Sequence, residues 1–411
     1  MVKLNNLYHH EVDIYSLPGF VPQIVDEDYL RKLGVTALPS AETLEGLKRG
    51  SEIFQRRMQQ RCVIPVPQLA LDEIDVNSEL EIHNYTGKCP TLTYEINPVS
   101  GCNVGCLYCL VTDGVHENQL KAYTNYHLLV RRVLEEKWNE QHYYYFSPKT
   151  EALQEPSLQT GIAHRVLKEF IAHYEKHPDS KARLFIASKA GYRQLMYEYE
   201  GETILDLFEK LKDRMQFNTS VSIMPAQFRS ILEPYAATLD ERMKAVRACQ
   251  ERGVMSNSAL VQPIVAPYLT EEHIREFFGM LKENGIINYK PEFLTACMEN
   301  LAMIGQLLGY FDKNLERQLY DDYIAPDNAD HKKQRGRTAP ARALSIENIK
   351  KMMRITDEMG LSISICYWVR QQLKISEEMI PIINRNGFQC LGYLKMRNWW
   401  IVPIPYVWLR V

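Results

Sequence analysis

Three cysteines lie close together in the stretch Ser100-Gly101-Cys102-Asn103-Val104-Gly105-Cys106-Leu107-Tyr108-Cys109. Their C-x3-C-x2-C spacing allows one short loop to turn three thiolates toward a single iron–sulfur cube. Because a four-iron cluster has four irons, three protein ligands leave one iron open to a small molecule. The alternatives are three unrelated buried thiols or a structural zinc site. Zinc usually takes four ligands as two separated pairs, and the sequence has no second C-x2-C pair or Cys/His pair at matching spacing. The spacing therefore favours a cluster held by Cys102, Cys106 and Cys109.

Alternating strands and helices surround this loop. The residues directly before it, 91–96, have the β-branched and aromatic content of a strand. Further strands are predicted over 142–147, 183–188, 217–224, 257–265 and 286–295, and helices over 125–139, 156–176, 202–214, 239–252 and 270–284. This order predicts an α/β fold, a partial (β/α)6 TIM-like barrel with helices outside a parallel sheet. An open doubly wound sheet is the alternative, but no Gly-x-Gly-x-x-Gly follows the first strand. In a barrel, the cysteine loop would lie at the C-terminal face, where chemistry is located.

The sequence divides into three parts: an N-terminal extension over 1–88, a core barrel over 89–295, and a C-terminal segment over 296–411 that closes the barrel and contributes to the substrate site. Residues 40–62 are predicted to be helical, with Ser40 as the N-cap. Gly46 and Gly50 weaken this prediction, so two shorter helices are the alternative. Pro65 and Pro67 require residues 63–67 to be extended or to turn.

In the C-terminal part, residues 325–340 are polar, with a basic run over 331–337. Such a run is usually a solvated face, and contact with an acidic substrate is the alternative. A helix capped by Ser345 is predicted over 345–360, followed by a strand over 361–368. The aromatic end over 398–411 is expected to be buried against the body.

Composition limits the function classes. The 48 Lys and Arg against 51 Asp and Glu give a formal charge of -3, which does not suit a protein that holds a long polyanion. Neither a signal peptide nor a stretch of membrane-spanning length is evident. The cysteines outside the loop are scattered, which favours a reducing compartment; they are Cys62, Cys89, Cys249, Cys297, Cys366 and Cys390. We therefore expect a cytoplasmic protein without a membrane contact.

From Cys102 to about Pro267, the order of motifs resembles the spore photoproduct lyase branch of the radical S-adenosylmethionine (SAM) superfamily. Residues 185–189, Phe-Ile-Ala-Ser-Lys, resemble the strand whose lysine reaches the SAM carboxylate in that family. The stretch 261–264 resembles the strand whose backbone faces the adenine. The family's next strand and helix are matched by Ser222-Ile223, Leu232-Glu233-Pro234, Leu239 and Arg242.

The resemblance implies a [4Fe-4S] cluster and SAM as cofactors and a set of residues that contact SAM. Lys189 would reach the carboxylate, Ser188 and Ser222 would help to hold SAM, and Tyr108 would pack near the adenine. The family's Gly-Glu pair for the SAM amine is absent, and Glu151 is the stand-in. The alternatives are a surface position for Glu151, a solvated Lys189, a Ser222 hydroxyl that satisfies the backbone, and a Tyr108 in the core.

The resemblance further implies an enzyme that cleaves SAM to a 5'-deoxyadenosyl radical and abstracts hydrogen from a substrate, with flavodoxin or ferredoxin as reductant. Lyases of that branch carry a hydrogen-donating cysteine after the second strand, and residues 146–156 contain none. A ribosomally synthesised peptide is therefore the expected substrate, for backbone excision, splicing or other tailoring, with a small protein as a further expected partner. Lyase-like repair or modification of nucleic acid, modification of a sugar or nucleoside, and a non-enzymatic iron–sulfur scaffold or sensor are the alternatives.

Overall fold

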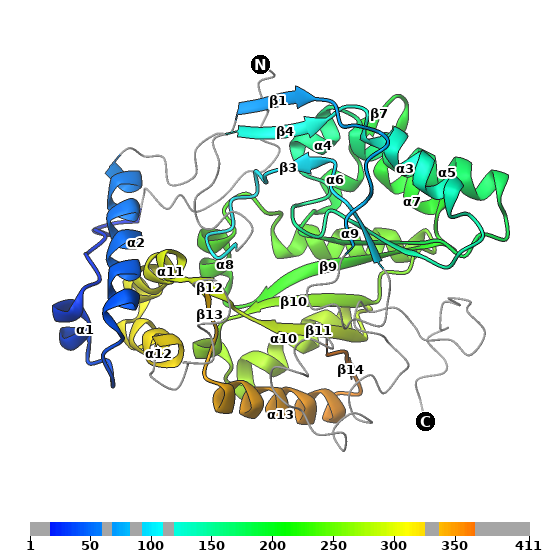
Figure 1. Cartoon of the computed structure of the whole chain (residues 1–411). Helices are drawn as coiled ribbons and strands as arrows, with labels where there is room; N and C mark the ends of the chain where they lie inside the picture. Colours follow the sequence, from blue (N-terminus) through cyan, green and yellow to red (C-terminus); the bar gives the residue numbers. More distant parts are fainter. Residues whose placement is uncertain (1–16, 60–67, 83–92, 110–118, 325–336, 366–411) are drawn as a thin grey trace.

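A parallel seven-stranded sheet organises the chain in the computed structural model, which describes residues 17–59, 68–82, 93–109, 119–324 and 337–365 (Figure 1). All neighbouring strands of this sheet are parallel. The edge strands are not paired with each other in the described part of the chain, so the sheet stays open as a partial barrel. In spatial order the strands are β14 (Ser362–Ile363), β11 (Asn288–Phe293), β10 (Ser258–Ile264), β9 (Met215–Ile223), β6 (Arg183–Ser188), β5 (Tyr143–Phe146) and β2 (Thr93–Ile96).

Helices cover the outer face of this sheet, as the alternating pattern predicted. They are α3 (Tyr126–Glu136), α5 (Ile162–Lys176), α7 (Ile204–Lys210), α9 (Leu239–Glu251), α10 (Glu271–Glu283) and α13 (Arg342–Glu358). Several begin where a threonine side chain accepts a hydrogen bond from the first turn, as Thr203, Thr238 and Thr270 do. Apolar side chains at every second strand position, such as Tyr144 and Phe146, are buried against these helices.

The opposite face of the sheet is largely polar. On β9, Phe217 and Val221 belong to the outer core, so Gln216, Asn218 and Ser220 face the other way. These three side chains are all buried. A small apolar cluster of Tyr145, Phe185 and Leu260 lies on the same inner face. The inner face therefore offers mainly amide and hydroxyl groups.

The fold class is confirmed. Most of the predicted strand ends lie within two residues of the observed ones. The additional strand predicted over 361–368 corresponds to β14, which makes the sheet seven-stranded. The helix predicted over 156–176 is instead two helices, α4 (Glu155–Gln159) and α5, so Ser157 does not open it. They separate at Gly161, which has a φ of 69° and whose absent Cβ would overlap the Tyr199 ring.

Two other helix boundaries differ from the sequence-based prediction. The segment predicted as one helix over 202–214 begins with the short strand β8 (Glu202–Thr203), which pairs with β7 (Glu198–Tyr199) before α7 starts. The helix predicted from Ser345 begins at Arg342, with Ala341 at the N-cap position. Pro340 precedes this start and supplies no backbone N–H. Ser345 therefore lies inside the helix, where it is buried.

Two helices that precede the sheet in the sequence, α1 (Glu27–Leu33) and α2 (Ala41–Gln59), pack beside the barrel against α11 (Met298–Phe311) and α12 (Lys313–Ile324) (Figure 1). No element was predicted over 298–324. The helix α2 is continuous despite its two glycines. A Cβ on Gly46 would lie 2.6 Å from Met298 Cβ, and one on Gly50 would lie 2.5 Å from Glu299 Cα. Both glycines therefore allow close helix packing and are not helix breakers.

Other described elements include α6 (Tyr192–Leu195), α8 (Ala226–Leu232), the 3-10 turn Ala266–Tyr268, and the antiparallel pair β12 (Ala296–Cys297) and β13 (Arg337–Thr338). The division at residues 88 and 295 stays a prediction. The predictions for 63–67, 331–336 and 398–411, and Cys62, Cys89, Cys366 and Cys390, lie outside the described residues. Among the described helices, none is long and apolar enough to cross a membrane.

Candidate active site

The cysteine loop begins just past the carboxyl end of β2. It follows the short strand β3 (Val99–Ser100), which pairs with β4 (Gln119–Tyr123) in a three-stranded sheet that also contains β1 (Gln68–Asp72). Gly101 and Gly105 have φ values of 84° and 69°, a backbone region in which other residues are strained. The two glycines on either side of Cys102 therefore allow the loop to fold back on itself.

One side of the loop is held by residues that follow β5. The backbone N–H of Asn103 donates to Gln154 Oε1 at 3.0 Å, and Gln154 Nε2 donates to the Gly101 carbonyl at 3.2 Å. The Asn103 side-chain amide donates to the Glu155 carboxylate. Gln154 and Glu155 are both buried. These contacts fix the loop against the start of α4.

The other side of the loop is held by two distant parts of the chain. The Leu107 N–H donates to the Leu232 carbonyl at the end of α8 at 2.9 Å, and the Tyr235 N–H donates to the Val104 carbonyl at 3.2 Å. From α11, Asn300 Nδ2 donates to the Leu107 carbonyl at 2.6 Å. The loop is therefore bound on both sides, which limits the positions its three sulfur atoms can take.

The three thiols share one environment. Burial raises the pKa of Cys102, and the nearby Cys109 and Cys106 raise it further. Burial also raises the pKa of Cys106 to about 12, although Lys189 and Arg242 oppose this shift. A thiolate at Cys106 would thus have two cations nearby to balance its charge.

The spacing of the sulfur atoms does not suit a single metal ion. Two thiolates on one tetrahedral zinc lie about 3.8 Å apart, given Zn–S bonds of about 2.3 Å. Among the described residues, Glu135, His173 and His177 each have a ligand atom within 4.8 Å of the other two, whereas the three loop thiols are not gathered that closely. A cube of four irons spreads its ligands more widely than one ion does. The zinc alternative is therefore the weaker one.

Glu233 is the centre of a buried charge cluster next to the loop. Its carboxylate pairs with Arg242, accepts a hydrogen bond from Tyr108 Oη and accepts another from Ser222 Oγ at 3.2 Å. Burial alone would raise the pKa of Glu233, but Arg242, Lys189 and Tyr108 outweigh it and lower the pKa to about 2. Glu233 therefore stays ionised and connects two predicted SAM contacts, Tyr108 and Ser222.

Lys189 follows the last residue of β6 and extends toward the same cluster. Its ammonium nitrogen lies 5.5 Å from the centre of the Tyr108 ring. Burial opposes the charged form, but Cys106 and Glu233 raise the pKa of Lys189 above its ordinary value. The side chain is half-buried. Lys189 is thus a partly desolvated cation beside the cysteine loop and not a solvated surface lysine.

Glu151 is buried, and the alternative of an ordinary surface position does not describe it. Its carboxylate accepts from the backbone N–H of Lys189 at 2.7 Å, from that of Leu153 at 3.1 Å and from Ser188 Oγ. Its own backbone N–H lies near the Cys102 thiol and favours the thiolate. Glu151 and Ser188 therefore connect the end of β6 to the cysteine loop.

The structure thus brings all the predicted site residues to the carboxyl ends of β2, β5, β6 and β9. Glu233, Arg242, Gln154 and Asn300 were not among the predicted site residues, although they hold that site together. Glu233 and Arg242 appeared in the motif order, but their burial as a pair was not visible in the sequence. Asn300 carries no local signal, because its contact with Leu107 is made across the fold.

Comparisons with known proteins include one curated relative and one solved structure. No family model matches the chain. The chain is 25% identical over 240 residues to the uncharacterized protein ORF301 of Acidianus two-tailed virus, which covers 55% of this chain and 76% of the viral protein. The structure has a TM-score of 0.48 and 14% identity to that of a tyrosine-to-phenylalanine mutant of spore photoproduct lyase, over 81% of this chain and 87% of that one. Neither similarity assigns the chain to a family.

Proposed function

We propose that the chain is a radical SAM enzyme whose [4Fe-4S] cluster is bound by Cys102, Cys106 and Cys109. The observation that carries this proposal is the cysteine loop itself. It holds three thiols in one environment, it is fixed on both sides, and it lies at the carboxyl ends of parallel strands. Chemistry in barrels of this kind is located at that end of the sheet.

The residues present fit an iron–sulfur cluster. Thiolates are the ligands that such clusters take. Cys106 is buried, and the positive charges of Lys189 and Arg242 offset the negative charge that ligation would place there. When bound, the cluster would supply the electron that cleaves SAM to a 5'-deoxyadenosyl radical, and a flavodoxin or ferredoxin would supply that electron to the protein.

The surrounding residues would bind and orient SAM. The Lys189 ammonium is a positive charge suited to the SAM carboxylate, and charge-assisted contacts of this kind are strong. The Tyr108 ring, held through its hydroxyl by Glu233, presents an aromatic face for the adenine. Ser222 and Ser188 contribute hydroxyl groups. Glu151 is the proposed partner of the SAM amine. Its carboxylate already accepts three hydrogen bonds, and an ionised carboxylate can accept about four.

Iron analysis tests the cluster proposal. Anaerobic reconstitution of the wild-type chain is expected to give about four irons per chain, the content of one cube. Cys109→Ala should lose the cluster because it removes one of three ligands. Cys249→Ala should retain it, since Cys249 is buried on α9 away from the loop. Equal iron content in the two variants would reject the assignment of the loop, and about eight irons in the wild type would contradict a single cluster.

We further propose that the substrate is a ribosomally synthesised peptide, modified by backbone excision, splicing or other tailoring. Three features support this. Residues 147–156 contain no cysteine to act as the hydrogen donor of a lyase. The inner face of the sheet offers amide and hydroxyl groups, which match the hydrogen-bonding groups of a peptide. On that face, Lys290 pairs with Glu292 at 2.7 Å and does not present an unbalanced charge to phosphate.

The substrate is tested by offering candidates to the reduced, SAM-loaded protein. Short peptides encoded beside its gene should change in mass, and the change should depend on Cys102, Cys106 and Cys109. Ultraviolet-damaged DNA should remain unchanged. Dimer reversal with turnover would instead favour the nucleic-acid alternative, and reaction of a sugar or nucleoside alone would favour the metabolite alternative. If the peptide is altered only when a small protein is added, that protein is the proposed partner.

A further inference from the structure

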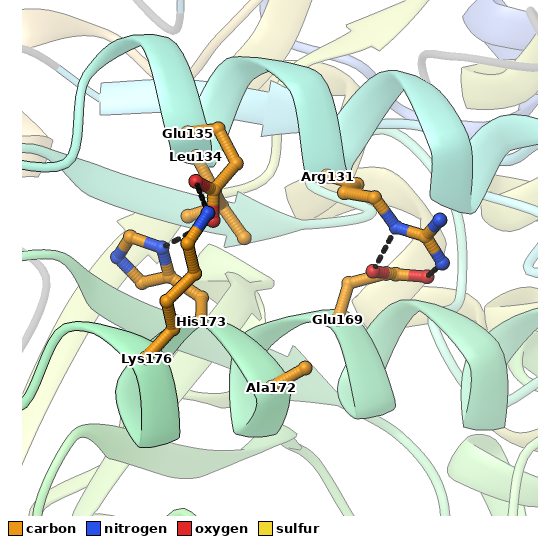
Figure 2. Close-up of a pocket in the computed structure, with 7 residues that line it drawn as sticks. All are labelled: Arg131, Leu134, Glu135, Glu169, Ala172, His173 and Lys176. Atoms are coloured by element: carbon orange, nitrogen blue, oxygen red, sulfur yellow. Dashed lines mark hydrogen bonds and ion pairs between the residues drawn. The ribbon is translucent and has the colours of Figure 1, made fainter.

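A second group of metal-binding side chains lies far from the cysteine loop. Two of its members, Glu135 and His173, line a pocket of about 240 Å³ between the ends of α3 and α5 (Figure 2). Figure 2 shows Glu135 on α3 facing His173 and Lys176 on α5, with the Arg131–Glu169 ion pair one turn away. Both helices end just before the strands that follow them begin. The pocket is therefore at the amino ends of the strands, opposite the proposed active site.

Three ligand atoms converge at the edge of this pocket, because His177 lies next to the lining residues Glu135 and His173. One atom each from Glu135, His173 and His177 all lie within 4.8 Å of one another. Glu135 Oε1 lies 3.8 Å from His173 Nδ1, and Glu135 Oε2 lies 3.3 Å from His177 Nε2. Ligands about 2.0–2.1 Å from a tetrahedral zinc ion are separated by about 3.3 Å. The three atoms lie within 4.8 Å of one another, so side-chain movements of up to about 1.5 Å would bring them to that geometry.

His173 is oriented as a metal ligand would be. Only 3% of the residue is exposed, and its Nε2 lies 2.8 Å from Ser180 Oγ. Its other nitrogen, Nδ1, is buried without a hydrogen-bond partner and is directed toward Glu135. A histidine that binds a metal through one nitrogen usually hydrogen-bonds through the other, which fixes the ring. Ser180 provides that second contact here.

The local charge favours a cation. Both α3 and α5 end at this pocket, and the C-terminal end of a helix carries partial negative charge. In the structure, the Lys176 ammonium supplies positive charge at this place, because it pairs with Glu135. Lys176 is exposed and can turn into solvent without leaving a buried charge. A divalent ion would therefore displace a flexible surface lysine.

We propose that Glu135, His173 and His177 bind one divalent transition-metal ion of the Zn²⁺ class, with water completing its coordination. Two histidines and one carboxylate form a ligand set that zinc accepts with an open position. The ion would connect the C-terminal ends of α3 and α5 on the outside of the barrel. This proposal is independent of the cluster, because none of its ligands belongs to the cysteine loop.

Cobalt binding to the full chain tests the proposal. Co²⁺ replaces Zn²⁺ as the probe because it quenches nearby indole fluorescence, and its absorption distinguishes nitrogen and oxygen ligands from thiolates. Trp138 stacks on His177 with ring centres 4.8 Å apart, so it reports on this site. The wild type should show saturable quenching that Zn²⁺ reverses and Mg²⁺ does not. Any Co²⁺ that binds to cysteines does so in the wild type and in every variant, so it does not affect the difference between their titrations.

The substituted residues are exposed or partly exposed, so a change in Co²⁺ binding would not reflect a failure to fold. His177→Ala removes a partly exposed ligand and should weaken Co²⁺ binding by at least about tenfold. Even the loss of a residue that only hydrogen-bonds to a metal ligand weakens binding by about that much. Lys176→Met should tighten binding, because it removes the competing cation. His273→Ala, a histidine on α10 outside the pocket, should behave as the wild type. Identical titrations for the wild type, His177→Ala and Glu135→Gln would overturn the proposal, as would absorption from thiolate ligands alone.

Discussion

At the scale of single residues, the site depends on the buried pair of Glu233 and Arg242, which are 1% exposed each. Removing one member of a buried ion pair leaves the other charge uncompensated, which costs about 3–5 kcal/mol. We therefore predict that Glu233→Gln lowers the free energy of unfolding by that amount, measured by urea denaturation at neutral pH. Glu272→Gln, an exposed residue on α10, is the control and should change stability little. Equal effects of the two substitutions would contradict the role given to Glu233.

The same residue gives a pH dependence with a definite sign. The folded-state pKa of Glu233 is lowered from 4.5 to about 2, so its carboxylate stabilises the folded chain at pH values above 4.5. That contribution is lost as the pH falls from about 4.5 toward 2. The stability difference between the wild type and Glu233→Gln should therefore shrink over this range. A difference that grows with acidity would contradict the assignment.

Lys189 is the residue whose proposed role in binding SAM is most directly testable. A charge-assisted contact with a carboxylate is worth about 1.5–3 kcal/mol, so Lys189→Ala should weaken SAM binding by about 10- to 150-fold. The iron content should stay close to that of the wild type, because Lys189 is not a cluster ligand. Calorimetric titration of the reconstituted protein with SAM measures the change. Lys181→Ala, an exposed lysine just before the same strand, serves as the control. An unchanged dissociation constant for Lys189→Ala would remove the residue from the binding site.

At the scale of elements, replacing either of two helix glycines by alanine should change stability in opposite directions. A helix-interior glycine costs about 1 kcal/mol relative to alanine when nothing else intervenes. Gly279 on α10 has no atom within 4 Å of an added Cβ, so Gly279→Ala should stabilise the protein by about that amount. Gly50→Ala should destabilise it, because the new Cβ would lie 2.5 Å from the Glu299 backbone. Thermal denaturation of both variants measures the signs, and stabilisation by Gly50→Ala would show that α2 and α11 are not so close.

The same elements show what local sequence can and cannot predict. The strand at 183–188 was predicted with its observed bounds, because a run of apolar residues between polar ends is a local signal. The continuity of α2 was not predictable, since Gly46 and Gly50 are explained only by Met298 and Glu299, about 250 residues later. The break between α4 and α5 likewise depends on Tyr199, which packs where Gly161 would carry a side chain.

At the scale of the whole molecule, the alternation of strands and helices along the chain sets the order of the strands in the sheet. That order determines which strand ends meet at the candidate site. Successive β-α units place neighbouring strands in parallel, so the ends of β2, β5, β6 and β9 meet at one edge. Together with the family resemblance of residues 185–189 and 222–242, this order allowed Cys106, Lys189 and Ser222 to be predicted near one another from sequence. The contact of Asn300 with Leu107 could not be predicted, because it joins residues 193 positions apart in the chain. Glu233 and Arg242 lie near each other in the sequence, but their burial beside Tyr108, 125 residues before Glu233, depends on the packing of the whole site.

The most direct test of the proposed function is the release of 5'-deoxyadenosine from SAM by the reduced, reconstituted protein. The wild type and Cys249→Ala should release it. Cys106→Ala should not, because Cys106 is one of three ligands and the two that remain, Cys102 and Cys109, are too few to hold the cluster. Chromatography of a single anaerobic incubation measures the product. Release by Cys106→Ala at the wild-type rate would contradict the assignment of the cysteine loop, and so would its absence from the wild type.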